Sequence, residues 1–401
     1  MQRGMRVRHV MVSCLMARIF YEMAKELLTE YAHGYFYQRF LYINSSITFV
    51  GTKVYSMGRV RIESIGCFLP ERVVATSELV GRMAVKPAFD IEQITGIKTR
   101  RFRDQGETSY SMAMHAVEDC LKNSIYMPSE LDCVINASIS RFTRELKYVF
   151  EPPLSLMIKN RIGAHRAINF DISNACAGMN TGIYILHNMI KSGIVRNGMV
   201  VSGETITTAA EIAVKEIRDP IDPQFASLTG GDAAAAVILD RAAGLDEGID
   251  FIDFVTLADW AELCFAMPST MNPGVVMYTD TFGMSSMELV GRMPAVLNDT
   301  FRKYGRPFNP ADFDYVIFHQ VAMPAIKKYR KVCEEKLGVA MPPMLWVVDE
   351  LGNTASNSHY VVIHRKLKEG VIKAGTRLLI VSTASGVQGG IMSCKLGDLK
   401  V

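Results

Sequence analysis

The sequence predicts a protein of the α/β class. From Arg59 onward, short apolar segments with strand character alternate with segments whose apolar residues recur at the helical period. The chain has 401 residues, of which 49% are hydrophobic and 21% charged, so it can bury a large core. This length favours two or three domains or one large duplicated fold.

The expected elements alternate along the chain. Continuous apolar runs are typical of strands buried on both faces, and the helices show apolar spacing near 3.6. Residues 244–250 form a plausible seam, so we divide the folded part into residues 59–243 and 244–401, although no repeat is visible by identity. We expect strands at 60–65, 131–137, 167–172, 199–202, 233–239, 315–318, 345–348 and 378–382, and helices at 110–121, 176–190, 287–304 and 324–337.

Cys176 stands at a junction where a strand pattern gives way to a helix pattern. Its neighbours Ala175, Ala177 and Gly178 are small and leave room for a substrate. A helix N-terminus has unpaired N–H groups and a partial positive charge, which favour a thiolate. The position therefore predicts a reactive cysteine with a lowered thiol pKa. The alternative is a small residue of the core.

Two polar side chains follow apolar runs later in the chain. His319 comes directly after residues 315–318, and Asn353 lies in a turn of small residues after residues 345–348. A thiol, an imidazole and a carboxamide at such ends can converge on one pocket. That set suits thiolate chemistry with neutral donors directed at an oxyanion. The alternative for each is a polar group satisfied within the fold.

Seven motifs occur in a fixed order from about residue 60 to the C-terminus. They are IESIGCFLPERVVATSEL at 62–79, ITGIKTRRF at 94–102, NACAG at 174–178, GGDAAAAVIL at 230–239, FHQ at 318–320, ELGNTAS at 350–356 and ASGVQGG at 384–390. The ordered set resembles 3-oxoacyl-(acyl carrier protein) synthase III, a condensing enzyme of the thiolase superfamily. The resemblance implies a thiolase-like five-layer αβαβα fold of two similar halves.

The resemblance also implies roles for individual residues. Cys176 would accept an acyl group, with its own N–H and that of Gly386 holding the oxyanion. His319 and Asn353 would bind the thioester oxygen of the second substrate, and Gln320 would contact substrate beside them. The implied reaction is an acyl transfer to Cys176 followed by Claisen condensation with a malonyl-type thioester. Such an acyltransferase serves fatty acid or polyketide biosynthesis, as a homodimer without a cofactor.

Glu151 departs from the usual family pattern. In the family this region comes from the partner subunit and supplies an apolar residue to the acyl pocket. Residues 141–204 are similar instead to condensing enzymes of olefin and dialkylresorcinol synthesis, and in the olefin group a glutamate near this position acts as a base. The alternative reaction is therefore a non-decarboxylative condensation of two acyl thioesters with Glu151 as base. A solvated glutamate before Pro152 is the simpler interpretation.

The segment that binds coenzyme A in the family also differs. Asp90 replaces a tryptophan that stacks on adenine, and Ile94 replaces an arginine, so this stacking is not expected. Basic side chains can instead meet a phosphopantetheine arm or an acidic acyl carrier protein, although charged runs are usually solvated faces. The candidates are Lys98, Arg100, Arg101, Lys327, Lys328 and Arg330. The donor, acyl-CoA or acyl carrier protein, stays open.

The composition excludes several classes of protein. A net charge of +3 gives no sign of nucleic acid binding. The eight cysteines are scattered without a CxxC pair, which indicates free thiols in a reducing, cytoplasmic location and no zinc site. No apolar stretch reaches the ~18 residues of a transmembrane helix.

Residues 1–58 fall outside the family pattern. Their first twenty residues are basic, with a short apolar run at 10–16. They allow three interpretations: a signal peptide that lacks an Ala-x-Ala site, an amphipathic targeting helix, or an upstream extension of a protein whose translation starts at Met57.

Two other classes share part of this pattern. A papain-like protease uses Cys, His and Asn in this chain order, but its local cysteine signature is missing. A non-catalytic thiolase-fold subunit would serve as a partner to an active chain. Such subunits typically lose the cysteine, whereas this chain retains all three residues. Trapping a labelled acyl group on the protein distinguishes the three classes.

Overall fold

Two β-sheets organise the part of the chain that the computed structural model describes, residues 59–143, 147–219, 222–244 and 246–401. The first sheet has five strands in the order β1-β7-β6-β4-β5, and the second has four in the order β11-β12-β13-β8. The first comprises β1 (Val60–Phe68), β4 (Cys133–Asn136), β5 (Ile168–Asp171), β6 (Gly198–Glu204) and β7 (Ala233–Arg241). The second comprises β8 (Gly248–Thr256), β11 (Tyr315–Phe318), β12 (Arg377–Ala384) and β13 (Gln388–Lys395).

The two sheets repeat one pairing pattern. In the first, β1 and β6 flank β7 in antiparallel fashion, and β4 and β5 continue in parallel from β6. In the second, β8 and β12 flank β13 in antiparallel fashion, and β11 is parallel to β12. A parallel bridge between Val316 and Met344 occupies the place of the fifth strand. The expected fold of two similar halves is therefore confirmed.

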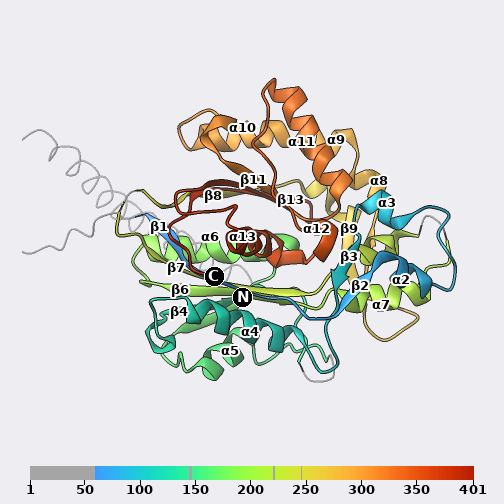
Figure 1. The fold of residues 1–401 in the computed structure, drawn as a ribbon, viewed down its shortest axis with the longest axis horizontal. Coiled ribbons are helices and arrows are strands. Elements are labelled where there is room, and N and C mark those ends of the chain that lie inside the picture. The colour runs from blue at the N-terminus through green and yellow to red at the C-terminus, as the bar shows by residue number, and fades with distance from the viewer. Residues whose placement is uncertain (1–58, 144–146, 220–221, 245) are drawn as a thin grey trace, which may run out of the picture. The chain divides into compact units, whose positions relative to one another are not determined.

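Helices complete five layers (Figure 1). Helices α4 (Ser109–Lys122) and α5 (Leu154–Ile162) cover the outer face of the first sheet, and α10 (Met293–Lys303) and α11 (Met323–Leu337) cover the outer face of the second. Between the sheets lie α6 (Gly178–Lys191) and α13 (Ser358–Lys368), whose apolar side chains join the core of both halves. This αβαβα arrangement places the start of each central helix near the middle of the molecule.

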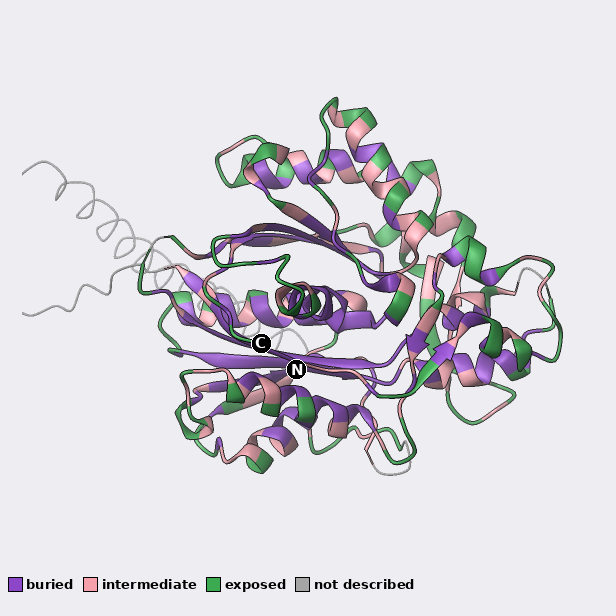
Figure 2. Cartoon of the chain, in the orientation of Figure 1, coloured by how far each residue is buried: buried purple, intermediate pink, exposed green. Residues whose placement is uncertain are grey.

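Small residues set the distance between layers. Both faces of β7 are buried, and its run of alanines at 233–236 presents little bulk to the helices (Figure 2). A Cβ at Gly66 would lie 2.1 Å from the Cys120 nitrogen, and one at Gly203 would lie 2.1 Å from the Ser109 oxygen. Glycine therefore allows α4 to pack directly on the sheet backbone.

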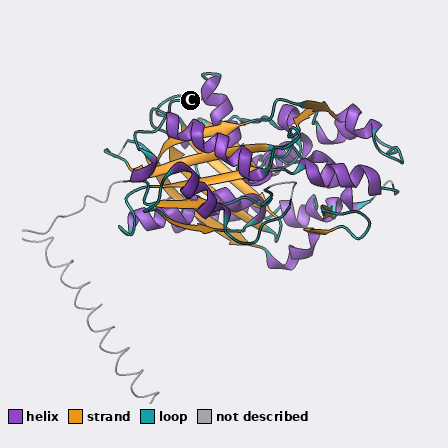
Figure 3. Cartoon of the chain, turned by 90° about the horizontal axis from the view of Figure 1, so that it is seen from below, coloured by secondary structure: helices purple, strands orange, loops and turns teal. Residues whose placement is uncertain are grey.

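Seen from below, the strands are enclosed by helices (Figure 3). Short elements cluster at one end of the sheets, on the right in Figure 1. They include the two small ribbons β2–β3 and β9–β10. The bounds are β2 (Val73–Ala75), β3 (Thr99–Arg101), β9 (Cys264–Pro268), β10 (Val275–Thr279), α2 (Thr76–Gly81), α3 (Ile91–Thr95), α7 (Thr207–Glu216), α8 (Thr281–Met284), α9 (Met287–Val290) and α12 (Val348–Leu351). The 3₁₀ turns are η1 (Pro128–Glu130), η3 (Ala175–Ala177), η4 (Pro223–Thr229), η5 (Ala258–Leu263), η6 (Pro310–Asp312) and η7 (Ala355–Asn357).

Two expected elements are wrong. The helix expected at 287–304 is two helices, because α9 ends before Gly291 and α10 starts anew with Pro294 in its first turn, where the missing N–H does no harm. The strand expected at 345–348 is absent among the described residues. The Val347 N–H donates to the Gln320 side chain instead of a strand, and Val348 opens α12.

The interpretations of residues 1–58 concern a segment outside the described residues. In the part that the structure describes, no helix combines the length and the apolar character needed to cross a membrane.

Candidate active site

A strained turn presents Cys176 at the centre of the molecule. The chain leaves β5 at Asp171 and enters the 3₁₀ turn η3, in which Ala175 has φ 43°. A positive φ is uncommon for a residue other than glycine and is maintained only where the surrounding structure enforces it. Helix α6 then begins at Gly178, whose own Cβ would lie 2.7 Å from the Ala137 oxygen. Cys176 thus lies one turn before the central helix.

Cys176, His319 and Asn353 line one cavity of about 730 Å³. This size is within the range of small-molecule sites. Much of the wall is apolar, with contributions from the segment before α3 and from α3, η4, β10, α9 and α11: Phe89, Ile91, Phe225, Met277, Val290 and Tyr329. The three residues that the sequence singled out therefore do converge, in surroundings that suit an apolar chain attached to a reactive head group.

The expected lowering of the Cys176 pKa is wrong. Burial raises the pKa of this thiol to about 12, and the nearby Cys264 and Glu204 raise it further, against a smaller lowering by the backbone N–H of Cys176 itself. The thiol is therefore protonated near neutral pH. It must lose its proton as it attacks a substrate rather than before.

The raised pKa predicts how Cys176 reacts with iodoacetamide. Because the thiolate fraction grows tenfold per pH unit below the pKa, alkylation should accelerate about tenfold per unit from pH 7 to pH 10. Mass spectrometry of the Cys176 peptide at timed intervals gives the rate. Free cysteine serves as the control, since its rate levels off above its pKa of about 8.5. A rate for Cys176 that is already level near pH 7 would contradict the raised pKa.

His319 is held as a neutral imidazole facing the cavity. It follows β11, is 3% exposed, and its Nδ1 lies 3.0 Å from the Ser358 hydroxyl at the start of α13. Its Nε2 is buried and has no hydrogen-bond partner among the described residues. Burial, aided by the neighbouring His359, lowers the pKa of His319 to about 3. If the Ser358 hydroxyl donates to Nδ1, then Nε2 carries the proton and can donate to a ligand.

Asn353 is oriented by its own turn. Its Oδ1 accepts a hydrogen bond from the Ala355 N–H at 2.9 Å, and its N–H donates to the Thr229 oxygen at 2.8 Å. Since the carboxamide oxygen is occupied, the amide nitrogen is left for the cavity that Asn353 lines. His319 and Asn353 can therefore both act as uncharged donors.

Gly386 lies in the turn between β12 and β13, beside the Cys176 turn. Its φ of 116° is a conformation that other residues rarely adopt. The neighbouring Ser385 lines the cavity, and the Gln388 side chain donates to Asn174 Oδ1, two residues before Cys176. This contact joins the two turns that the sequence expects to supply the oxyanion donors.

Gln320, expected to contact substrate, lies outside the cavity wall in this structure. It is fully buried and does not line the cavity. Its Nε2 donates to the Phe318 oxygen at 2.7 Å, and its Oε1 accepts from the Val347 N–H at 3.0 Å. The side chain therefore connects the end of β11 to the segment before α12.

The basic residues that the sequence suggested as carrier contacts differ in exposure and in their partners. Lys98 and Lys327 are exposed, whereas Arg101 donates to the oxygens of Pro70 and Glu71, and Arg330 pairs with Glu334. Arg100 is completely buried, and burial lowers its pKa to about 10. Of the basic candidates, only Lys328 lines the cavity, so these six residues do not form a basic rim around it.

Glu151 lies apart from the cavity of its own chain. It is exposed and follows an aromatic cluster in which Phe150 is 80% exposed. The Tyr148 ring meets Phe142 edge-on and lies tilted against Phe150. Asp90, at the position of the family's tryptophan, caps α3 by accepting from the Gln93 N–H, and Ile94 lies at the cavity.

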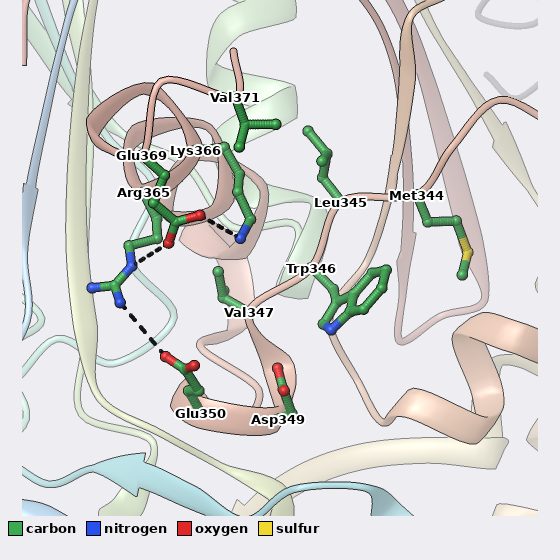
Figure 4. Close-up of a pocket in the computed structure, with 10 residues that line it drawn as sticks. All are labelled: Met344, Leu345, Trp346, Val347, Asp349, Glu350, Arg365, Lys366, Glu369 and Val371. Carbon is green, nitrogen blue, oxygen red and sulfur yellow. Dashed lines mark hydrogen bonds and ion pairs between the residues drawn. The ribbon is translucent and has the colours of Figure 1, made fainter.

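A second hollow of about 230 Å³ lies beside α12 and α13 (Figure 4). Asp349 and four other charged side chains line it, and those four pair with each other: Arg365 with Glu350 and Glu369, and Lys366 with Glu369. None of the residues predicted for catalysis lines it. These paired charges leave little for a ligand to neutralise.

The sequence missed several residues around the cavity. Cys264 lines it, and its sulfur accepts hydrogen bonds from Ser385 at 3.1 Å and Thr279 at 3.3 Å. Ser358 and Glu204 stand close to the reactive side chains as well. Periodicity and spacing give no sign of these contacts, since each depends on segments far apart in the chain.

Comparison with known proteins agrees with this architecture. The family model for 3-oxoacyl-[acyl-carrier-protein (ACP)] synthase III matches residues 170–259, and the model for its C-terminal part matches residues 306–396. The beta-ketoacyl-[acyl-carrier-protein] synthase III of Deinococcus deserti is 29% identical over 333 residues, which cover 81% of this chain and 88% of that protein.

Solved structures share the fold. The 3-oxoacyl-[acyl-carrier-protein] synthase III of Aquifex aeolicus aligns with a TM-score of 0.69 at 24% identity, covering 84% of this chain and 99% of that one. A variant of Xanthomonas campestris OleA with bound lauric acid and lauroyl-CoA aligns with a TM-score of 0.70 at 20% identity, covering 85% and 100%. Fold, family models and relatives agree, and the chain is a 3-oxoacyl-(acyl carrier protein) synthase III-like condensing enzyme, an acyltransferase with a thiolase-like fold.

Proposed function

We propose that Cys176 is the nucleophile that carries the acyl group. Its sulfur attacks the carbonyl carbon of an acyl thioester, and the oxyanion of the tetrahedral intermediate is held by the N–H groups of Cys176 and Gly386. The bond to the donor thiol then breaks, and the donor sulfur leaves with the proton that Cys176 has lost. The acyl chain stays bound to Cys176 in the apolar cavity.

The second half-reaction in this proposal is a decarboxylating Claisen condensation. A malonyl-type thioester loses carbon dioxide, and its carbanion is stabilised as an enolate by the neutral donors His319 and Asn353. The carbon attacks the acyl carbonyl, the bond to Cys176 breaks, and the thiolate takes a proton from water. The product is a 3-oxoacyl thioester.

One observation supports this assignment most: the convergence of Cys176, His319 and Asn353 on one apolar cavity. A thiol with two uncharged donors suits a reaction in which negative charge develops on carbonyl oxygens. Assaying the purified protein with an acyl thioester and either a malonyl thioester or a second acyl thioester tests the proposal. A 3-oxoacyl product from the malonyl substrate is expected, and its absence with every acyl donor would contradict the proposal.

We further propose that the chain works as a homodimer. Strand β5 is at the edge of the first sheet, and Ile168 at its start is 46% exposed. The exposed Tyr148 and Phe150 add aromatic surface in the segment before α5. An unpaired strand edge together with apolar surface favours association of two copies.

Glu151 supports a second candidate reaction. Its exposure in this aromatic segment allows a partner chain to receive it. If the second substrate has no carboxylate to lose, a base must remove an α-proton, and a carboxylate transferred from water into an apolar cavity would gain basicity. The structural likeness to OleA shows a shared fold, and the reaction without decarboxylation stays our alternative.

Glu151→Gln separates the two reactions. If Glu151 is the base, the variant should acylate Cys176 normally but lose at least about 10²-fold in condensation of two simple acyl thioesters. The assay compares wild type and variant with malonyl and simple acyl substrates. Wild-type activity only with the malonyl substrate, unchanged in the variant, would contradict the base role.

Mixed dimers test whether Glu151 crosses between subunits. Cys176→Ala and Glu151→Gln chains are inactive separately if both residues are essential. Mixing them forms one site with an intact Cys176 from one chain and an intact Glu151 from the other, so activity should return. Continued inactivity in verified mixed dimers would place both residues in the same chain's site.

The carrier and the location are also proposals. Lys328 at the cavity, with the exposed Lys98 and Lys327, offers positive charge to a phosphopantetheine arm delivered by coenzyme A or by acyl carrier protein. The seven cysteines that the structure describes are all free thiols, in keeping with a reducing compartment such as the cytoplasm.

A further inference from the structure

Two matching turns relate the halves of the protein. Among the described residues, Ala175 and Ala355 are the non-glycine residues with positive φ, at 43° and 56°. Each opens a 3₁₀ turn, η3 or η7, that runs into a central helix, α6 or α13. Ser356 therefore occupies in the second half the place that Cys176 occupies in the first.

Ser356 faces the other half of the protein. Its side chain is 1% exposed, and it does not line the cavity. Its hydroxyl donates to Glu204 Oε1 at 2.6 Å and lies 2.6 Å from the Ser202 hydroxyl. Glu204 and Ser202 belong to β6 of the first sheet. This contact thus fixes the η7 turn of the second half to a strand of the first.

Glu204 is built as a fixed anchor. It is completely buried, and its carboxylate accepts from the N–H groups of Ile139 at 2.9 Å and Ser140 at 3.0 Å. It also accepts from the hydroxyls of Ser140 at 2.8 Å and Ser202 at 3.0 Å, besides Ser356. A buried carboxylate needs such donors, and four of them remain if the Ser356 hydroxyl is removed.

The turn that Ser356 fixes also orients Asn353. The Ala355 N–H donates to Asn353 Oδ1 at 2.9 Å, and this geometry depends on the strained φ of Ala355. Such strain persists only where neighbouring contacts hold the backbone in place. Without the bond from Ser356 to Glu204, Ala355 can relax towards an ordinary conformation, which moves its N–H away from Asn353.

We propose that Ser356, anchored by Glu204, is a positioning residue that holds the Asn353 amide towards the cavity. The inference rests on the proposed role of Asn353 as an enolate donor. Ser356 touches no substrate and acts through the backbone of η7. Its influence therefore falls on condensation, in which Asn353 takes part, and not on acyl transfer to Cys176.

Ser356→Ala tests the proposal, with Ser140→Ala as a matched control. Both variants remove one hydroxyl from the same carboxylate, but Ser140 does not belong to the turn of Asn353, whereas Ser202 would be a poor control because its hydroxyl also contacts Ser356. Ser356→Ala should condense roughly 10- to 100-fold more slowly, which is less than the loss of a whole oxyanion donor. Acylation of Cys176 should stay within about twofold of wild type in both variants, and Ser140→Ala should condense at near the wild-type rate.

A double-mutant cycle with Asn353→Ala identifies the route of the effect. If Ser356 acts through Asn353, the Ser356→Ala change should have no further effect on condensation in the Asn353→Ala background. Multiplying effects, or an equal fall in acylation and condensation, would overturn the proposal and leave Ser356 a structural residue. Equal loss in Ser140→Ala would assign the effect to the carboxylate instead.

The outcomes also separate this inference from the proposed function. Normal condensation by Asn353→Ala would remove the donor role of Asn353 and this inference with it, whereas normal condensation by Ser356→Ala alone would overturn only the inference. Should Ser356→Ala fail to fold, Ser356→Cys fills the site with a weak S–H donor, and the same division between the half-reactions is expected.

Discussion

Cys176→Ala should abolish acyl-enzyme formation and reduce turnover by roughly 10⁴-fold or more, the scale of loss when a covalent nucleophile is removed. The fold should persist, because alanine fits where a half-buried cysteine acts as a small side chain among Ala175, Ala177 and Gly178. Turnover with an acyl and a malonyl thioester, measured beside thermal unfolding, checks both expectations.

Cys264→Ala is the matched comparison for this variant. Cys264 lines the same cavity, but it lies at the start of β9 and not on the strained turn before α6. An acyl adduct should therefore still form on Cys176 in Cys264→Ala. If Cys176→Ala kept near wild-type turnover, or if adduct formation depended on Cys264 instead, the assignment of the nucleophile would be wrong.

His319→Ala and Asn353→Ala should each slow condensation by about 10²–10³, or about 3–4 kcal/mol of transition-state stabilisation. Acylation of Cys176 should change little, since the proposed oxyanion donors for that step are backbone N–H groups. Single-turnover experiments that follow acylation and condensation separately give the two rates.

Two results would reverse this division of roles. Loss of acylation with normal condensation of a preformed acyl-enzyme would move His319 and Asn353 to the first half-reaction. The pH dependence of the His319→Ala defect gives the second result. If the variant were slower than wild type only below pH 7, the wild-type imidazole would act in its charged form, contrary to the pKa of about 3 that burial gives His319.

The sequence predicted the parts of the fold that rest on strong local patterns. The continuous apolar run of β7 and the helical spacing of α4 are both present close to the expected bounds. The five-layer arrangement came from the ordered motifs. The helix expected at 287–304 failed because Gly291 and Pro294 interrupt it, and the strand expected at 345–348 failed because Val347 pairs with a side chain.

The candidate site, too, could be predicted from the sequence only in part. Cys176, His319 and Asn353 could be identified because each ends a recognisable run and sits in a motif, and the structure brings them to one cavity. The pKa of Cys176 could not, because it depends on burial and on Cys264 and Glu204, which are distant in sequence. The roles of Gln320 and Arg101 also depended on tertiary contacts, which proved to be with backbone oxygens and N–H groups. Glu204 carries no local signal, and Ser356 ends the ELGNTAS motif, but its role depends on a bond to Glu204, 152 residues away in the sequence.

The acyl adduct on Cys176 is the most direct test of the central claim. The full-length protein is incubated with an acyl-CoA or an acyl carrier protein substrate and no second substrate, quenched in acid, digested and examined by mass spectrometry. The account predicts one acyl group per chain on the peptide that contains Cys176, removed when a malonyl thioester is added before the quench. An adduct on another residue, or sustained condensation without any adduct on Cys176, would contradict it.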